Sequence, residues 1–126
     1  MRLHDLLENY LNDIETAVNA LPAYAESYME EILAADRVNL RIRLRFNNGN
    51  LLEINEAIVI AAGTLTALGY RYHCQNAANT LLFRYDDTPH FPTLATFPHH
   101  KHTRNSVIAH DKPELLDVLH EAAHTD

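Results

Sequence analysis

The sequence predicts an α+β fold in which two N-terminal helices pack on a four-stranded antiparallel sheet of hairpins, followed by a histidine-rich loop and a C-terminal helix. Three observations predict this order. Apolar residues recur with helical spacing over residues 3–35, alternate with polar residues over residues 39–86, and return to helical spacing over residues 112–124. Strands joined by short turns form an antiparallel sheet. A chain of 126 residues fits one domain, residues 1–126.

Two helices are expected at the N-terminus. In residues 3–20, Leu7, Leu11 and Ile14 follow one another at intervals of four and three, which places them on one face of a helix. A proline then separates this helix from a second one over residues 22–35. Neither segment contains an internal glycine or proline, and both consist mainly of residues with high helix propensity.

Four strands with two-residue periodicity follow. The first alternates apolar side chains with Arg41, Arg43 and Arg45, so one of its faces is buried and the other is basic. Three more strands are expected at residues 51–60, up to about residue 74, and at residues 80–86, with turns rich in asparagine and glycine between them. The final helix is expected over residues 112–124, with Asp111 as its N-cap.

The expected sheet has one face for the helices and one face left for solvent or a ligand. Antiparallel sheets commonly have one packed face and one solvated face. On the second face the alternation places a set of basic side chains, namely Arg41, Arg43, Arg45, Arg71, His73 and Arg84.

Composition indicates a globular protein, with 47% hydrophobic and 21% charged residues. No apolar run reaches the ~18 residues that a membrane-spanning helix needs, and acidic residues interrupt the N-terminus where a signal peptide needs an apolar stretch. The single cysteine, Cys74, forms no internal disulfide framework. We therefore expect a cytoplasmic protein without membrane association.

The net charge of −7 hides a strong segregation of charge. Residues 1–36 carry eight acidic side chains and one basic one, whereas residues 37–110 carry eight basic and four acidic side chains together with six histidines. Residues 111–126 are acidic again. A polyanion would therefore meet the middle segment and be repelled by the ends, although two acidic helices flanking an ordinary sheet would give the same pattern.

The segment TFPHHKH supplies His99, His100 and His102 together with Lys101, and His90 lies shortly before it. Three interpretations remain open. Imidazole ligates zinc, copper and nickel, which allows a metal site formed by His90, His99, His100 and His102. Histidine also titrates near neutrality, which suits acid–base catalysis. The third interpretation is a solvated polar loop without a chemical role.

RNA cleavage without a metal is the leading hypothesis from these residues. One group removes the proton of the 2′-hydroxyl, another protonates the leaving 5′-oxygen, and cations stabilise the charge on phosphorus. His73 and one histidine of residues 99–102 are the expected base and acid, and Arg84 stabilises the transition state. The expected phosphate contacts are Arg41, Arg43, Arg45, Arg71 and Lys101.

Several of these residues also have a purely structural interpretation. The three arginines of the first strand are equally compatible with cross-strand partners such as Glu53. Arg84 forms an ion pair with Asp86 or Asp87 in that interpretation, and His73 is an ordinary surface residue of a strand.

The segments RLRFNNGNLLEINEA, GYRYHCQ, LLFRYDDTPHFP and TFPHHKH resemble the TumE family, the toxins of a class of toxin–antitoxin pairs. The resemblance covers about residues 37–104. It implies a small cytoplasmic toxin that is neutralised by a cognate antitoxin. The order of elements is also similar to that of RelE-like, BECR-type ribonuclease toxins, in which two helices precede an antiparallel sheet.

The resemblance places the family's recurring polar residues on a defined set of positions: Glu53, Glu56, Tyr72, His73, Gln75, Arg84, Asp86, His90, His99, His100, Lys101 and His102. Three positions depart from the family pattern. Cys74 stands where an aromatic residue is frequent, Asp87 where asparagine is frequent, and Phe91 where the family has a second histidine.

The sequence thus predicts the toxin of a toxin–antitoxin system, acting as a metal-independent endoribonuclease without a cofactor. Its expected partners are RNA and the antitoxin, and a homodimer is compatible with the sequence. Two alternatives remain: a histidine-ligated metal enzyme or module that binds a divalent ion such as zinc, and a non-catalytic protein whose basic sheet face binds an acidic partner.

Overall fold

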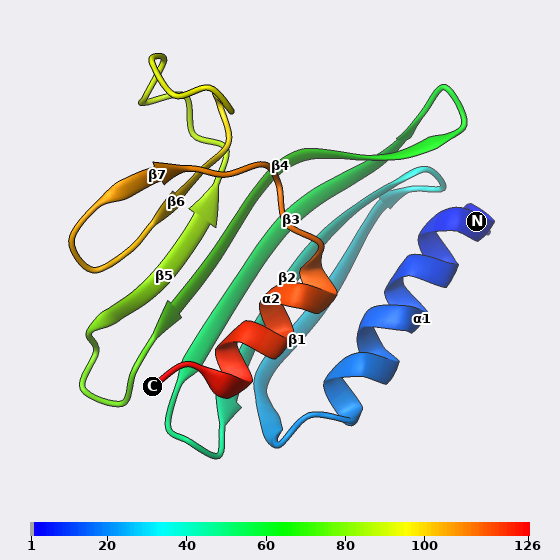
Figure 1. Cartoon of the computed structure of the whole chain (residues 1–126). Coiled ribbons are helices and arrows are strands. Elements are labelled where there is room, and N and C mark those ends of the chain that lie inside the picture. The colour runs from blue at the N-terminus through cyan, green and yellow to red at the C-terminus, as the bar shows by residue number, and fades with distance from the viewer. Residues whose placement is uncertain (1) are drawn as a thin grey trace.

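The computed structural model describes residues 2–126, in which one helix, seven strands and a second helix follow one another (Figure 1). The helices are α1 (Asp5–Asn19) and α2 (Leu115–His124). The strands are β1 (Ala23–Ala34), β2 (Arg37–Phe46), β3 (Leu51–Ala61), β4 (Thr64–Gln75), β5 (Leu81–Asp86), β6 (His100–His102) and β7 (Val107–Ala109). The α+β class predicted from the sequence is confirmed.

All of these strands form a single sheet in which each strand pairs with the next one along the chain, always antiparallel. The register between β2 and β3 runs without a shift, whereas bulges interrupt the β1–β2, β3–β4 and β4–β5 pairs. Residues paired directly across neighbouring strands point to the same face of a sheet. The register therefore decides which polar side chains meet.

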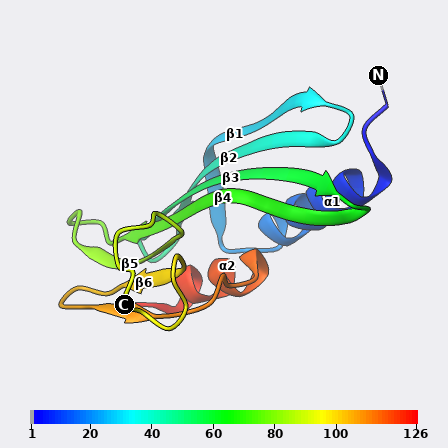
Figure 2. The same cartoon turned by 90° about the horizontal axis from the view of Figure 1, so that it is seen from above.

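Both helices pack on the same face of the sheet (Figure 2). α1 buries Leu7, Leu11, Ile14 and Val18, and α2 buries Leu115, Val118, Leu119 and Ala122. Below them lie buried strand residues that include Leu40, Leu44, Ile54, Tyr72 and Phe83. We call this side the helix-covered face and the opposite side the open face. The expectation of one packed and one solvated sheet face is confirmed.

The prediction of a second N-terminal helix is wrong, because residues 22–35 contain the edge strand β1. Its sequence, AYAESYMEEILA, is rich in good helix formers, but it pairs with β2 along its whole length. The carboxylate of Glu26 also accepts hydrogen bonds from Arg43 and Arg45 of β2. Pairing with a neighbouring strand outweighs a helix propensity that amounts to tenths of a kcal/mol per residue, roughly.

The prediction of four strands is also wrong, since β1, β6 and β7 join the sheet as well. The histidine-rich segment is therefore a strand, preceded by a long loop over residues 87–99 that projects beyond the end of β5 (Figure 1). The C-terminal helix is confirmed, but it begins at Leu115 with Glu114 at the N-cap position, and Asp111 lies outside it.

Within residues 2–126, neither helix has the length and apolar character that crossing a membrane requires.

Candidate functional site

The open face carries two rows of polar side chains that run across the strands from β2 to β6. The first row consists of Arg43, Glu53, His73, Arg84 and His102, each paired with the next. The second row, formed in the same way, consists of Arg41, Asn55, Arg71, Asp86 and His100. Neighbouring strands lie ~4.8 Å apart, so each row spans roughly 19 Å. The sheet register thus brings most of the predicted site residues together.

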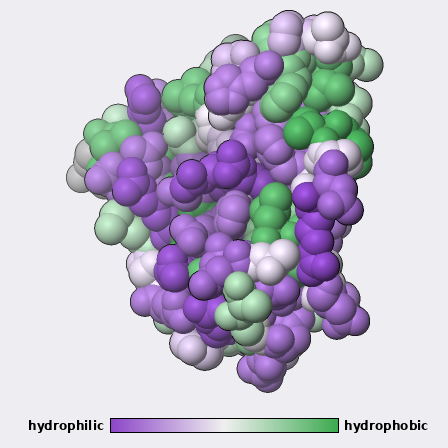
Figure 3. All heavy atoms as spheres, turned by 90° about the vertical axis from the view of Figure 1, so that its left-hand side faces the viewer, coloured by the Kyte–Doolittle hydropathy of each residue, from purple (hydrophilic) through white to green (hydrophobic). Residues whose placement is uncertain are grey.

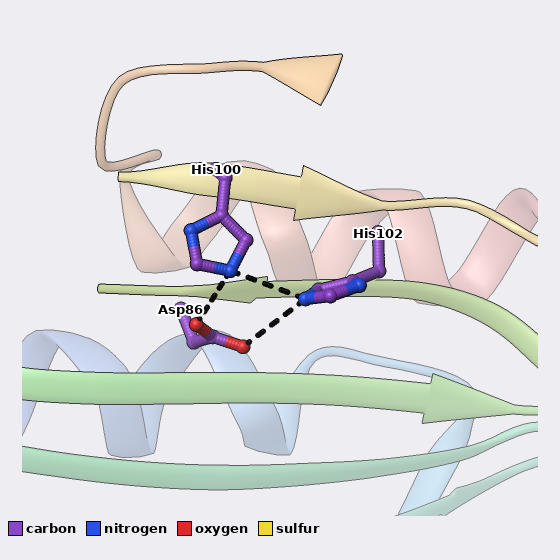
Figure 4. Close-up of side chains that lie close together, drawn as sticks. All are labelled: Asp86, His100 and His102. Carbon is purple, nitrogen blue, oxygen red and sulfur yellow. Dashed lines mark hydrogen bonds and ion pairs between the residues drawn. The ribbon is translucent and has the colours of Figure 1, made fainter. Parts of the chain in front are cut away.

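The β6 end of these rows is a compact cluster of Asp86, His100 and His102 (Figure 4). His100 Nε2 lies 2.8 Å from Asp86 Oδ1 and 3.1 Å from His102 Nε2, and His102 Nε2 lies 3.7 Å from Asp86 Oδ2. The side chains of Asp86 and His100 are only 2% and 1% exposed, whereas that of His102 is 23% exposed. His102 is therefore the member of the cluster that a substrate can reach.

The hydrogen bonds of His100 restrict what its ring can do. Its Nδ1 donates to the carbonyl oxygen of Pro98 at 2.9 Å, because a carbonyl only accepts. Nε2, which faces Asp86 and His102, then either donates as part of an imidazolium or presents a lone pair. The first state forms a charged pair with Asp86, and the second suits a metal ion between the three side chains.

Arg84 and Phe91 complete the surroundings of the cluster. Arg84 Nε donates to Asp86 Oδ2 at 3.1 Å, which confirms the predicted Arg84–Asp86 ion pair. The Phe91 ring lies edge-on to His100 and His102, with centroids 5.0 and 5.9 Å away.

Burial lowers the pKa of His102, and the positive charge of Arg84 lowers it further, although Asp86 opposes this. His102 is therefore neutral more readily than an ordinary histidine.

His73 lies on β4, directly opposite Arg84 in the register. Its Nε2 contacts the Gln75 side-chain oxygen at 3.2 Å. Burial lowers the pKa of His73, and Arg84 acts in the same direction, while Gln75 and Glu53 oppose the shift. His73 and His102 thus flank Arg84 in one row, each about one strand spacing from it, ~4.8 Å between backbones.

The arginines of the open face divide into paired and unpaired ones. Arg43 binds Glu26 at 2.8 Å and Glu53 at 3.0 Å, and Arg45 binds Glu26 at 3.1 Å. A phosphate would therefore have to displace existing ion pairs at these two arginines. The structural interpretation anticipated the pair with Glu53 but not the pairs with Glu26.

Arg41 and Arg71 make no ion pair with any acidic side chain within residues 2–126. They lie on either side of Asn55 in a shallow pocket of about 260 Å³ on the open face. Two unpaired guanidinium groups and an amide are hydrogen-bond donors suited to a phosphate. The surface at the nearby β5–β7 edge is also mostly hydrophilic (Figure 3).

Lys101 and His99, two of the predicted site residues, do not join the cluster. Lys101 is paired with Tyr85, on the helix-covered face, and its Nζ binds Glu121 of α2 at 2.8 Å. His99 Nδ1 lies 3.0 Å from the hydroxyl of Tyr70, a core residue of that face. Successive residues of a strand point to opposite faces, which separates His99 and Lys101 from His100 and His102.

His90 is exposed in the loop before β6, with its ring centroid 6.3 Å from that of Phe91. The predicted metal site, with His90, His99, His100 and His102 as its four ligands, is therefore not formed. Among the described residues, the group whose ligand atoms come within 4.8 Å of one another is Asp86, His100 and His102.

The TumE toxin family model matches residues 9–125, which is nearly the whole chain. The chain belongs to the TumE toxin family. No curated protein and no solved structure gives a significant match. Membership implies an antitoxin as partner.

The central residue of the site in this TumE-family protein is Asp86, which the sequence indicates as an ion-pair partner of Arg84 and, by resemblance, as a recurring polar position of the family, but not as a site residue. Asp86 accepts hydrogen bonds from the Thr88 backbone N–H and from Arg84, and it contacts both histidines of β6. The alternation LLFRYD already placed Arg84 and Asp86 on one face. What the sequence did not indicate is that β6 pairs with β5, which places His102 opposite Arg84 and His100 opposite Asp86.

Proposed function

We propose that this TumE-family toxin cleaves RNA without a metal ion, through acid–base catalysis by His73 and His102 and charge stabilisation by Arg84. The observation that supports the proposal is their position in one row of the open face, with the two histidines on either side of the arginine. A phosphodiester seated over Arg84 would have an imidazole on each side. Arg84 can stabilise the negative charge that develops on phosphorus.

The reaction assigns one proton transfer to each histidine. His73 takes the proton of the 2′-hydroxyl, the 2′-oxygen attacks phosphorus, and His102 gives a proton to the 5′-oxygen as its bond to phosphorus breaks. The products are a 2′,3′-cyclic phosphate and a 5′-hydroxyl. Burial lowers the pKa of His102, but the carboxylate of Asp86, 3.7 Å from its Nε2, opposes that shift, and on this ground we assign the acid role to His102.

Asp86 and His100 act as positioning residues in this mechanism. Both are buried, and His100 is fixed by Pro98 on one side and by Asp86 on the other. The pocket between Arg41 and Arg71 would hold a neighbouring phosphate of the same RNA strand. In the second row, Arg41 and Arg71 would thus bind the substrate, while Asp86 and His100 orient His102, the reacting histidine of the first row.

Cleavage of single-stranded RNA by the purified protein in excess EDTA tests the proposal. We expect cleavage to a cyclic phosphate, and a loss of about 100-fold or more in rate for His73→Ala and for His102→Ala. His124→Ala, on α2, is the control and should leave the rate unchanged, because its ring lies on the helix surface and contacts the His120 carbonyl. Equal rates for His102→Ala and the unaltered protein would contradict the mechanism.

A metal-dependent reaction is the second candidate, and the geometry of Asp86, His100 and His102 favours it. Their facing atoms lie 2.8 to 3.7 Å apart, which is compatible with ligation of one ion by all three side chains. The bond from His100 Nδ1 to Pro98 is typical of a metal-bound histidine. Elemental analysis after dialysis, and cleavage that EDTA abolishes and zinc restores, would favour this candidate.

A further inference from the structure

The outer edge of β1 is an open strand edge next to a groove. Within residues 2–126, β1 is the first strand of the sheet order and pairs only with β2 (Figure 1). Its register is regular from Ser27 to Ile32, between two bulges. Several large apolar side chains around it are exposed, namely Tyr24, Met29, Ile32 and Leu33. A long exposed edge with apolar side chains is a surface on which another strand can pair.

The groove runs between β1 and α1. It consists of two hollows of about 330 and 310 Å³ that share Glu30 as a lining residue. Their walls combine apolar side chains, among them Leu11, Val18 and Tyr28, with the carboxylates of Glu8 and Glu15. The lining residues include no lysine, arginine or histidine.

Among the described residues, the carboxylates that line this groove have no basic side chain as an ion-pair partner. Glu8, Glu15 and Glu30 form no ion pair within residues 2–126. Burial and the neighbouring Glu15 raise the pKa of Glu30, and burial together with both carboxylates raises the pKa of Tyr28 to about 12. The Tyr28 hydroxyl is also buried without a hydrogen-bond partner among the described residues.

We propose that an extended segment of the antitoxin, carrying basic and apolar side chains, pairs with β1 as an eighth strand and fills the groove beside α1. Backbone pairing would use the open edge, and apolar side chains would cover Ile32 and Tyr28. Lysine or arginine side chains would neutralise Glu15 and Glu30. This proposal rests on family membership and does not depend on the ribonuclease activity.

A second copy of this chain fits the edge poorly. Antiparallel pairing of two β1 strands would bring together segments that each contain Glu26, Glu30 and Glu31. Like charges opposite one another destabilise a strand pair. The groove is also separate from the row of His73, Arg84 and His102, so RNA and the antitoxin segment would meet surfaces of opposite charge.

Two neighbouring glutamates of β1 provide a matched pair of variants. Glu30 is paired with Leu40, on the helix-covered face, and lines the groove. Glu31 is paired with Asn39, on the open face, and binds the Asn39 side chain. Charge reversal at the two positions changes the net charge equally but alters opposite faces. Glu30→Gln serves as a milder variant if charge reversal disturbs folding.

The test measures binding of the purified antitoxin encoded beside this chain to the full-length toxin. We expect Glu30→Lys to weaken binding by about tenfold or more and Glu31→Lys to leave it unchanged, with equal melting temperatures. We also expect slower amide exchange at residues 27–32 in the complex. Equal affinities for the two variants, protection confined to the Arg41–Arg71 surface, or dimerisation of the toxin through β1 would each overturn the proposal.

Discussion

Asp86 and His100 form a buried pair in which Asp86 Oδ1 lies 2.8 Å from His100 Nε2. The pair joins β5 to β6, and Asp86 also accepts the backbone N–H of Thr88 at the start of the following loop. The same carboxylate binds Arg84. One side chain therefore holds the histidine strand in the sheet and also orients the groups that face the substrate.

Replacing Asp86 should destabilise the fold as well as the site. Asp86→Ala leaves His100 and Arg84 without their shared acceptor, and removal of one member of a buried pair costs about 3 kcal/mol or more of unfolding free energy. Denaturation by urea measures this change. Asp117→Ala, which removes an exposed carboxylate from α2, is the control and should change stability by less than ~0.5 kcal/mol. A similar small change for Asp86→Ala would contradict the role assigned to the pair.

The sequence predicted β2 to β5 because apolar and polar side chains largely alternate along them, most regularly in β2. In NLRIRLRF one face is apolar and the other basic, and in LLFRYD the same alternation fixes the orientation of Arg84. Residues 22–35 misled the prediction because alanine, glutamate, methionine and leucine favour helices when no partner strand is considered. The strand pairing that decides the matter is a contact with β2, which local sequence does not encode.

Glu26 restrains two arginines of the open face, and its removal should increase the affinity for nucleic acid. Its carboxylate contacts Arg43 at 2.8 Å and Arg45 at 3.1 Å. Glu26→Gln removes the acidic partner of Arg45 and leaves Arg43 with Glu53 alone, so binding of a single-stranded oligonucleotide should tighten several-fold. The slope of log affinity against log salt should become steeper by roughly 0.7 for each additional phosphate that the freed arginines neutralise.

Glu31→Gln is the control for Glu26→Gln, since it removes the same charge from β1 without releasing an arginine. Fluorescence anisotropy over a range of salt concentrations measures both variants. If the affinity of the two variants rises equally, the effect comes from net charge alone, and the ion pairs do not restrain the arginines.

The site itself was only partly predictable. The open face and its basic residues followed from alternation, and His73, Arg84, His100 and His102 do share that face. If the segment HHKH is read as a strand, alternation places His99 and Lys101 on one face and His100 and His102 on the other. The pairing of β6 with β5 depends on the path of the loop over residues 87–99, for which the sequence offers no periodic signal.

The lowered pKa values of His73 and His102 determine the pH dependence of the proposed reaction. Catalysis needs one histidine neutral and the other protonated. Because both pKa values lie below the ordinary 6.5, the protonated acid becomes scarce as the pH rises, and the rate should be highest below pH 6.5. Rates of cleavage between pH 4.5 and 8.5 measure the profile. An optimum above pH 7.5 would contradict the assignment.

Removing the positive charge beside both histidines should move that profile. Arg84 lowers the pKa of His73 and that of His102, as burial does. Arg84→Gln should therefore shift the optimum to higher pH in addition to reducing the rate. The displaced optimum distinguishes the electrostatic role of Arg84 from loss of folding, which would reduce the rate at every pH without moving the optimum.

On the helix-covered face, Glu56 should make the protein less stable as the pH rises. Its carboxylate accepts hydrogen bonds from the hydroxyls of Tyr10 and Tyr72 and lies 3.5 Å from Lys112 Nζ. Burial raises the pKa of Glu56 although Lys112 and Tyr10 oppose the shift.

A carboxyl group whose pKa is higher in the folded state than in the unfolded state binds more protons when folded. The resulting stabilisation is complete below pH 4.5 and is lost as the pH rises through the raised pKa of Glu56. Glu56→Gln keeps an uncharged acceptor for Tyr10, so its unfolding free energy should fall less between pH 5 and pH 8 than that of the unaltered protein. Urea denaturation at both pH values measures the difference, and Glu53→Gln, on the open face, should behave as the unaltered protein does. A steeper fall for Glu56→Gln would show that Lys112 holds Glu56 ionised throughout this range.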